Sequence, residues 1–157
     1  MSHEPLLELL VQYRAALEAQ VSLLQQLEAI ASRQHATSEA RDFARLAIES
    51  DRRDRLTRSL LTIEEGLTAV REGLAAPPRG VESLDEFAAV MHLRKAAADI
   101  VARILATDKE SMKVLSDAEL ARRAAIASLD RGEVTLDAYR KVLAPPVANA
   151  ALLDRRG

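Results

Sequence analysis

The chain contains no cysteine and no tryptophan, and aromatic residues make up only 3% of its 157 residues. The absence of cysteine excludes a disulfide, a thiol nucleophile and a thiolate metal ligand. With two phenylalanines in the whole sequence, a core has to be filled by Leu, Ile, Val and Ala. Such a core suits the contact lines, or seams, between packed helices.

The chain also lacks an excess of charge of one sign, because its formal net charge is −2 and both signs are mixed along it. This balance argues against a general electrostatic attraction to nucleic acid or to an anionic membrane. The longest uncharged run, residues 142–153, is shorter than the roughly 20 residues that span a bilayer. The first residues include Glu4 and Glu8 and no basic segment, so no signal peptide is predicted. A cytoplasmic protein is compatible with these features.

Glycine and proline are scarce, with five of each, and their placement predicts where helices end. Neither occurs in residues 6–65 or in residues 81–131, whereas residues 77–80 contain two prolines and a glycine. This cluster predicts a turn between two long helices. Ser83 and Glu86 fit a capping box at the start of the last helix.

Apolar residues recur at alternating spacings of three and four in each long segment, which is the heptad pattern of helices that pack along a seam. The expected seam residues are Leu10, Tyr13, Leu17, Val21, Leu24 and Leu27, then Leu56, Leu60, Ile63, Leu67, Val70 and Leu74, and finally Phe87, Met91, Ala98, Val101, Leu105, Met112, Leu115, Ile126 and Leu129. Residues 32–40 hold no strongly apolar position, so a bend is predicted there, with Thr37 or Ser38 as the cap of a new helix. The alternative is one continuous helix from residue 5 to residue 75.

The predicted fold is all-α: an elongated antiparallel three-helix hairpin bundle with coiled-coil-like seams. A single domain, residues 1–157, would contain helices at about 5–34, 39–75 and 84–130 and a C-terminal tail, residues 131–157. Short connections make consecutive helices antiparallel. This predicts that Leu74 faces Leu84, that Leu67 faces Met91, and that Leu56 faces Val101 or Ala102.

One polar residue interrupts the expected seam of the third helix. Asp108 falls between Leu105 and Met112 and lies opposite approximately residue 50 in the antiparallel register. Our hypothesis is an ion pair with Arg52 or Arg53 that fixes the register of the helices. The alternative is a seam that opens at this point and leaves Asp108 in contact with water.

The third helix is expected to extend about a dozen residues past the second helix. Apolar positions without a partner in the same chain predict a docking surface or a dimer contact. Gly132 is predicted to end this helix, so that Leu136 and Tyr139 fold back over its last turns. The tail over residues 142–153 would dock on the bundle or bind a partner. The predicted partner-binding residues are Met112, Leu115, Leu120, Ile126, Leu129, Leu136 and Tyr139.

The sequence holds no motif of a catalytic, metal or cofactor site. Of the three histidines, His3 lies at the terminus and His35 in the predicted bend, where we expect it to be exposed. His92 and Lys95 follow the spacing of the His-x-x-Lys-Gly element of histidine phosphotransfer domains, with Ala96 in place of Gly. The interpretation that we favour is an ordinary solvated histidine on a helix flank. We therefore expect a protein that is not an enzyme.

With the helices assigned, the sequence resembles the flagellar export chaperones of the FlgN and FliT kind. The resemblance covers most of the chain and is carried by residues 42–74, DFARLAIESDRRDRLTRSLLTIEEGLTAVREGL, and by residues 103–140, RILATDKESMKVLSDAELARRAAIASLDRGEVTLDAYR. The chain departs from the family at Asp108, where an Asn-rich stretch is usual, and after Tyr139, where the family commonly has Gly.

The resemblance implies a cytoplasmic chaperone that holds hook–filament junction or cap proteins unassembled and delivers them to the type III export apparatus. The main alternative is a structural or adaptor coiled-coil protein that mediates protein–protein association or forms a homodimer. A more distant alternative is a histidine phosphotransfer domain that uses His92.

Overall fold

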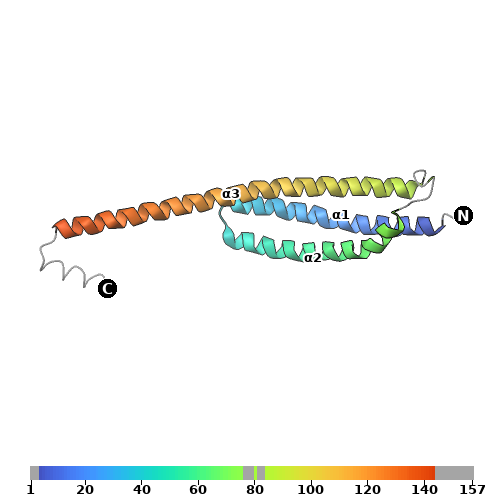
Figure 1. Cartoon of the computed structure of the whole chain (residues 1–157), viewed down its shortest axis with the longest axis horizontal. Helices are drawn as coiled ribbons and strands as arrows, with labels where there is room; N and C mark the ends of the chain where they lie inside the picture. Colours follow the sequence, from blue (N-terminus) through green and yellow to red (C-terminus); the bar gives the residue numbers. More distant parts are fainter. Residues whose placement is uncertain (1–3, 76–79, 81–83, 144–157) are drawn as a thin grey trace. The chain divides into compact units, whose positions relative to one another are not determined.

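The structure, a computed structural model, describes residues 4–75, 80 and 84–143, and for residues 129–143 it describes the helical backbone alone. It consists of three helices, α1 (Glu4–Glu39), α2 (Phe43–Gly73) and α3 (Asp85–Leu143) (Figure 1). No strand occurs among the described residues, and the predicted all-α class is confirmed. The sequence predicts one domain, whereas the structure groups the chain into two compact units, Met1–Val114 and Leu115–Gly157.

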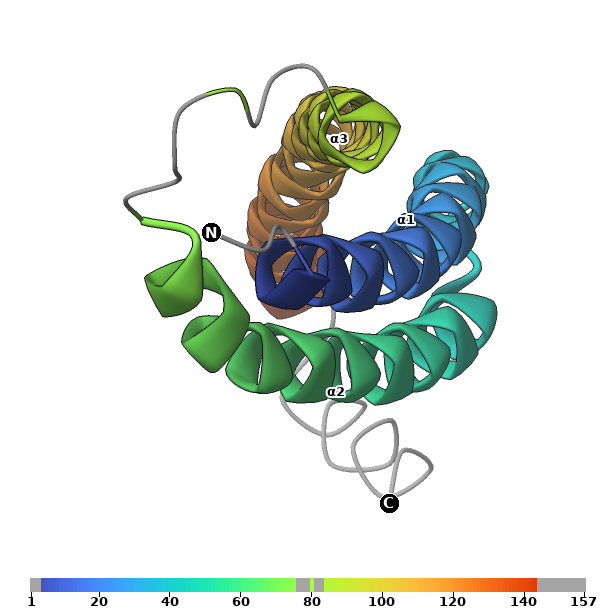
Figure 2. The ribbon, with the colours of Figure 1, turned by 90° about the vertical axis from the view of Figure 1, so that its right-hand side faces the viewer.

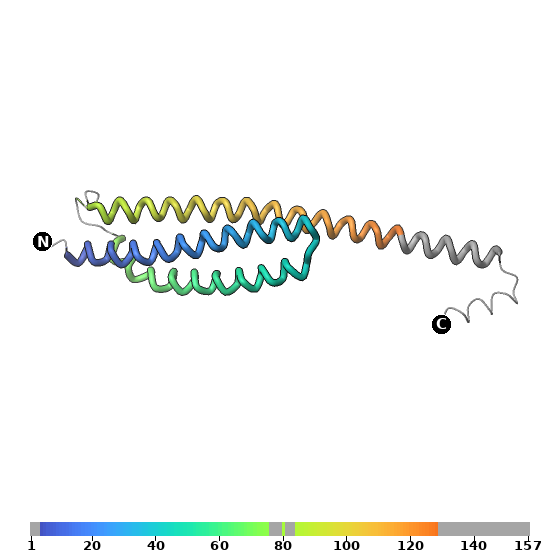
Figure 3. Tube along the Cα trace, turned by 180° about the vertical axis from the view of Figure 1, so that it is seen from behind, coloured from blue at the N-terminus to red at the C-terminus, as the bar shows by residue number. Residues whose placement is uncertain are grey.

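Within the first unit, α2 runs antiparallel to α1. Gln20 of α1 donates a hydrogen bond to Glu64 of α2. Arg33, which comes later in α1, lies 3.1 Å from Glu49, which comes before Glu64 in α2. Residue numbers therefore rise along α1 as they fall along α2. The tube in Figure 3 shows α2 returning along α1 after the turn that joins them. These two helices form the most closely packed pair of the unit.

The third helix runs parallel to α1. Arg14 lies 3.1 Å from Glu86, and Glu28 lies 2.9 Å from Arg103, so residue numbers rise together along both helices. The end-on view in Figure 2 shows α1 beside both α2 and α3. The first unit is therefore the up-down-up three-helix bundle that the sequence predicts.

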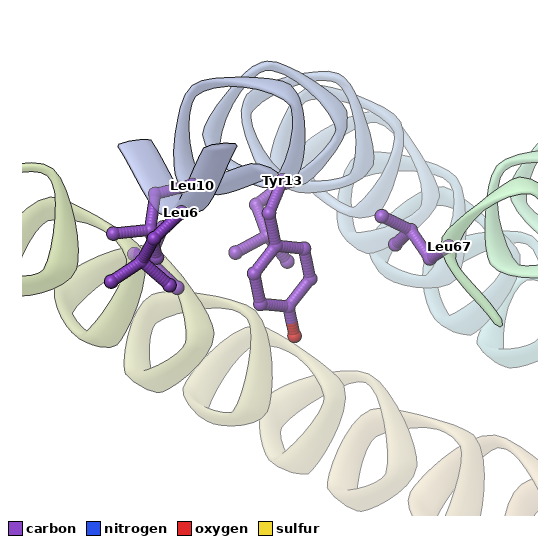
Figure 4. Packing of buried hydrophobic residues seen from close by; sticks show 6 residues of the cluster. Leu6, Leu10, Tyr13 and Leu67 are labelled. Carbon is purple, nitrogen blue, oxygen red and sulfur yellow. The ribbon is translucent and has the colours of Figure 1, made fainter. Parts of the chain in front are cut away.

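The core of the bundle is built mainly from α1. Leu10, Leu17 and Leu67 are each at most 2% exposed, and Tyr13 is 6% exposed. Figure 4 shows Leu10 and Tyr13 of α1 pointing toward α3, with Leu67 contributed by α2. A second cluster lies further along the bundle and contains Leu24, Leu27, Ala31, Ile100 and Ile104. The predicted seam of α1 is thus buried, and that of α2 packs against it.

The face that α3 buries differs from the predicted one by one residue. Val90, Ile100 and Ile104 are buried, whereas Met91, Val101, Leu105 and Met112 are 40% or more exposed. The prediction that Leu67 faces Met91 is therefore wrong, and Leu67 shares its cluster with Val90. The buried residues and the exposed residues each recur with heptad spacing, so α3 carries two neighbouring apolar stripes. The bundle covers one stripe and leaves the other exposed.

The turn between α1 and α2 lies later than expected. Residues 32–39 belong to α1, and the hydroxyls of Thr37 and Ser38 both donate to the carbonyl of Gln34 instead of capping a new helix. Arg41 adopts a left-handed φ of 56°, and the hydrogen bonds around it form a Schellman motif at the end of α1. The cap of α2 is Asp42, whose carboxylate accepts from the backbone N–H of Arg45.

A network of polar side chains lies at this end of the first unit. His35, expected to be exposed in a bend, is a helical residue with 30% of its side chain exposed, 3.1 Å from Glu39. Its Nδ1 lies 3.3 Å from the Ser111 hydroxyl of α3. The network therefore joins α1 to α3 at Ser111, which is buried.

The hypothesis of an ion pair at Asp108 is confirmed, and its partner is Arg53. The guanidinium donates to both carboxylate oxygens at 2.8 and 2.6 Å, and a further hydrogen bond joins it to Gln34 of α1. The hydrogen bond that Arg53 donates to Asp108 raises the pKa of Arg53, although burial acts in the opposite direction. Arg52, the other proposed partner, contacts Glu49 instead.

We expect Asp108→Leu to lower the free energy of unfolding by about 1–2 kcal/mol, because Arg53 would lose a two-point partner while remaining three-quarters buried. Because the pair is partly exposed to water, the expected loss of unfolding free energy is smaller than for a fully buried ion pair. Urea unfolding of the variant and of Arg53→Met/Asp108→Leu provides the measurement. A double variant as unstable as the single one would show that the pair is not the cause.

The third helix ends at Leu143 and not at Gly132 as predicted. A glycine inside a helix costs about 1 kcal/mol relative to alanine, which is too little by itself to end the helix. The proposed fold-back of Leu136 and Tyr139 after a break at Gly132 is therefore wrong. The predicted cap at Ser83 and the predicted docking of residues 144–157 lie outside the described residues.

Candidate functional site

The predicted partner-binding residues are divided between the two units. Met112, in the first unit, is 66% exposed; in the second unit Leu120 is 59% exposed, Ile126 is 43% exposed and Leu115 is half-buried. The side chains of Leu129, Leu136 and Tyr139 lie outside the described residues, and only their helical backbone is described. Large apolar side chains are thus exposed in both units.

The apolar residues of the second unit do not share one face of the helix. At about 100° per residue, Leu115 and Ile126 lie within roughly 20° of each other around the axis, whereas Leu120 lies roughly 140° from Leu115. Leu120 therefore belongs to a different surface from the other two. Leu115 and Ile126 are the pair that a single partner helix is able to cover.

A compact charge cluster occupies the helix between these residues. Arg122 donates two hydrogen bonds, of 2.9 and 2.8 Å, to the carboxylate of Glu119, and Arg123 donates a third of 3.1 Å. The hydrogen bond from Arg122 is the largest cause of a lowered pKa of Glu119, about 2. Glu119 is thus negatively charged at any physiological pH, and the surface around Ile126 carries both signs of charge.

We expect the Glu119 carboxyl to titrate near pH 2 and not near its ordinary value. Because the pKa is lowered by folding, the stabilisation from this cluster is fully present above the unfolded value of about 4.3 and is lost as the pH falls through 2. Side-chain carboxyl shifts measured by NMR across the acid range test this. Arg122→Ala should return the titration toward the ordinary value, and an unchanged midpoint in that variant would contradict the assignment.

The structure reveals a second exposed apolar surface that the sequence pattern assigned to the core. Met91, Val101, Leu105 and Met112, here called the α3 stripe, are between 40% and 66% exposed. The periodicity of the sequence shows these residues but does not show which of two neighbouring stripes is buried. Two neighbouring apolar stripes in the sequence of one helix indicate that one of them is exposed.

The residues that the sequence pattern associates with phosphate transfer lie about one helical turn apart on α3. His92 and Lys95 are both exposed on α3. Among the described residues, no group of three His, Cys, Asp or Glu side chains is arranged to hold a metal ion. Within the same residues, none of the helices has an apolar stretch long enough to cross a membrane. The phosphotransfer hypothesis for His92 stays a prediction.

A group of arginines on α1 and α2 was missed at the level of sequence. Arg33, Arg52 and Arg55 line one surface pocket between these helices. The polar run over residues 51–55 interrupts the apolar pattern of α2, and this interruption was the available signal. The interruption in α2 did not show that Arg33 of α1 lines the same pocket.

Comparison of this chain with models of protein families, with curated proteins and with solved structures finds no match in any of the three.

Proposed function

We propose that this protein is a cytoplasmic, non-enzymatic chaperone that binds flagellar hook–filament junction or cap proteins before their type III export. The proposal is supported by the resemblance of residues 42–74 and 103–140 to export chaperones and by the three-helix bundle of the first unit. The observation that carries it is the exposure of Ile126, on the helix face it shares with Leu115.

This surface has the chemistry needed to cover an amphipathic helix of a client. The apolar side chains of the client would pack on Leu115 and Ile126, as in other helix-in-groove recognition. The neighbouring charges of Glu119 and Arg122 would set the orientation of the client more than its affinity. Such binding would keep a polymerisation-prone client helix out of contact with other subunits.

The test is co-purification of the full chain with hook–filament junction and cap proteins expressed beside it. We expect Ile126→Asp to abolish capture, because a carboxylate would be buried against the apolar face of the client. The matched control is Ala124→Asp, which adds the same charge to an exposed position roughly 160° around the helix. Equal capture by the two variants, or no capture of any client by the unmodified chain, would refute the proposal.

A second candidate function, an adaptor that associates with its own copies, is favoured by the α3 stripe. A homodimer would bury these residues against the same residues of a second copy. Sedimentation equilibrium tests this, with Leu105→Asp expected to convert a dimer to a monomer and Leu61→Asp, at a 56% exposed position of α2, expected to leave it intact. A monomer over the whole concentration range would eliminate the adaptor hypothesis.

A further inference from the structure

A surface pocket of about 440 Å³ lies between α1 and α2 in the first unit. Its lining residues are Gln26, Ala29, Ile30, Arg33, Arg52, Arg55 and Leu56. Three of these are arginines and none is acidic. The pocket is separate from the client-binding surface proposed above and does not depend on it.

The arginines have hydrogen-bonding capacity that the protein does not use. Each guanidinium carries five N–H donors on three nitrogens, and in the described part of the chain each of the three arginines commits only one nitrogen. Arg33 and Arg52 use one each on Glu49, and Arg55 uses its Nε on the backbone carbonyl of Asp51. The remaining nitrogens are available to an acceptor from outside the chain.

The electrostatic balance of the pocket favours an anion. Glu49 is the carboxylate in contact with the arginine wall, and it is 2% exposed, so it lies behind the wall and not in the pocket. Three guanidinium charges against one carboxylate leave a net positive wall. Guanidinium groups bind carboxylates and phosphates with two parallel hydrogen bonds.

The rest of the lining is apolar and distinguishes between anions. Ile30 is only 3% exposed and offers little surface of its own, whereas Ala29 is exposed and Leu56 partly exposed in the lining. An inorganic anion would leave Ala29 and Leu56 uncovered, whereas a short hydrocarbon stem would bury their exposed surface. Covering apolar area contributes about 25 cal/mol per Å², so a stem strengthens binding.

We propose that this pocket binds a carboxylate carried on a short apolar stem, with Arg55 as the principal ligand and Ala29 and Leu56 as the contact for the stem. Two sources have this chemistry: a small organic acid, and an acidic side chain beside an apolar one in a peptide. Both sources present a carboxylate and an apolar group to the same pocket.

The test is an NMR titration of the full chain, with the Ile30 and Leu56 methyl groups and the arginine Nε–H groups as reporters. The probes are hexanoate for the free acid and N-acetyl-Glu-Leu-amide for the peptide, with acetate and hexylammonium as controls without the stem or the negative charge. We expect saturable shifts with at least one of the first two probes, weaker binding of acetate, and none of hexylammonium. The tighter of the two probes identifies the source.

Arg55→Ala should weaken binding roughly ten-fold, the effect of losing a charge-assisted hydrogen bond. Arg33 and Arg52 are less suitable for this test, because they also hold Glu49. The matched control is Arg58→Ala, on the same helix and exposed but outside the pocket, which should bind as the unmodified chain does. Absence of saturable shifts with both probes, or equal binding by the two variants, would overturn the proposal.

Discussion

Leu67→Ala is expected to lower the free energy of unfolding by about 3 kcal/mol, the cost of removing a buried leucine side chain and leaving a cavity. Leu67 is 2% exposed and is the deeply buried apolar residue of α2. It packs in one cluster with Leu10 of α1 and Val90 of α3, so its loss weakens contacts among all three helices. Thermal unfolding followed by circular dichroism should show a midpoint lower by roughly 6–12 °C.

The control for this variant is Leu61→Ala on the same helix. Leu61 is 56% exposed, so its truncation should change the free energy of unfolding by no more than about 0.5 kcal/mol. Both substitutions replace leucine by alanine in a helix and alter helix propensity equally. Similar destabilisation by the two variants would mean that α2 does not bury Leu67 as the structure shows.

The core of α1 was predicted correctly from its heptad spacing. Leu10, Leu17 and Leu24 repeat at intervals of seven, and all three are buried. Apolar residues also flank this stripe, since Leu7 is 41% and Val11 49% exposed, so the core follows from the spacing and not from an absence of other apolar residues. The same reasoning recovered Leu67 in α2.

The rotation of α3 was not predictable from its own pattern, because two apolar stripes lie side by side. Burying Met91 and Leu105 or burying Val90 and Ile104 satisfies heptad spacing equally well. In the structure Val90 and Ile104 are the buried residues. Arg103 pairs with Glu28 of α1 on one flank of α3. A pattern within one helix carries no information about such a partner.

The ends of the helices depended on local chemistry that patterns weigh poorly. Thr37 is a preferred capping residue, yet its hydroxyl bonds to the preceding turn and Asp42 caps α2 instead. Glycine is a frequent helix terminator, but the cost of Gly132 is only about 1 kcal/mol relative to alanine, and α3 continues past it to Leu143. Leu120 and Ile126 are exposed, and partner binding by these residues stays a prediction. The angles around the helix axis show that Leu120 faces away from Leu115 and Ile126.

The pair of substitutions Arg33→Ala and Arg52→Ala is expected to act far more strongly together than apart. Both guanidiniums donate to the same oxygen, Oε1 of Glu49, at 3.1 and 3.2 Å, and the Glu49 side chain is 2% exposed. Either arginine alone still compensates the charge, so each single variant should lose only about 1 kcal/mol. The double variant leaves a buried carboxylate unpaired and should lose about 3–5 kcal/mol, measured by urea unfolding.

Adding Glu49→Gln to the double variant separates the unpaired charge from the loss of arginine packing. A neutral amide costs far less to bury than a carboxylate, so the triple variant should recover most of the lost stability even though it has fewer polar contacts than the double one. Oε2 of Glu49 already lacks a hydrogen-bond partner among the described residues, which leaves the carboxylate dependent on the two donors at Oε1. If the effects of the two arginine substitutions simply add, or if Glu49→Gln gives no recovery, then the arginines act through their packing and not through the buried charge.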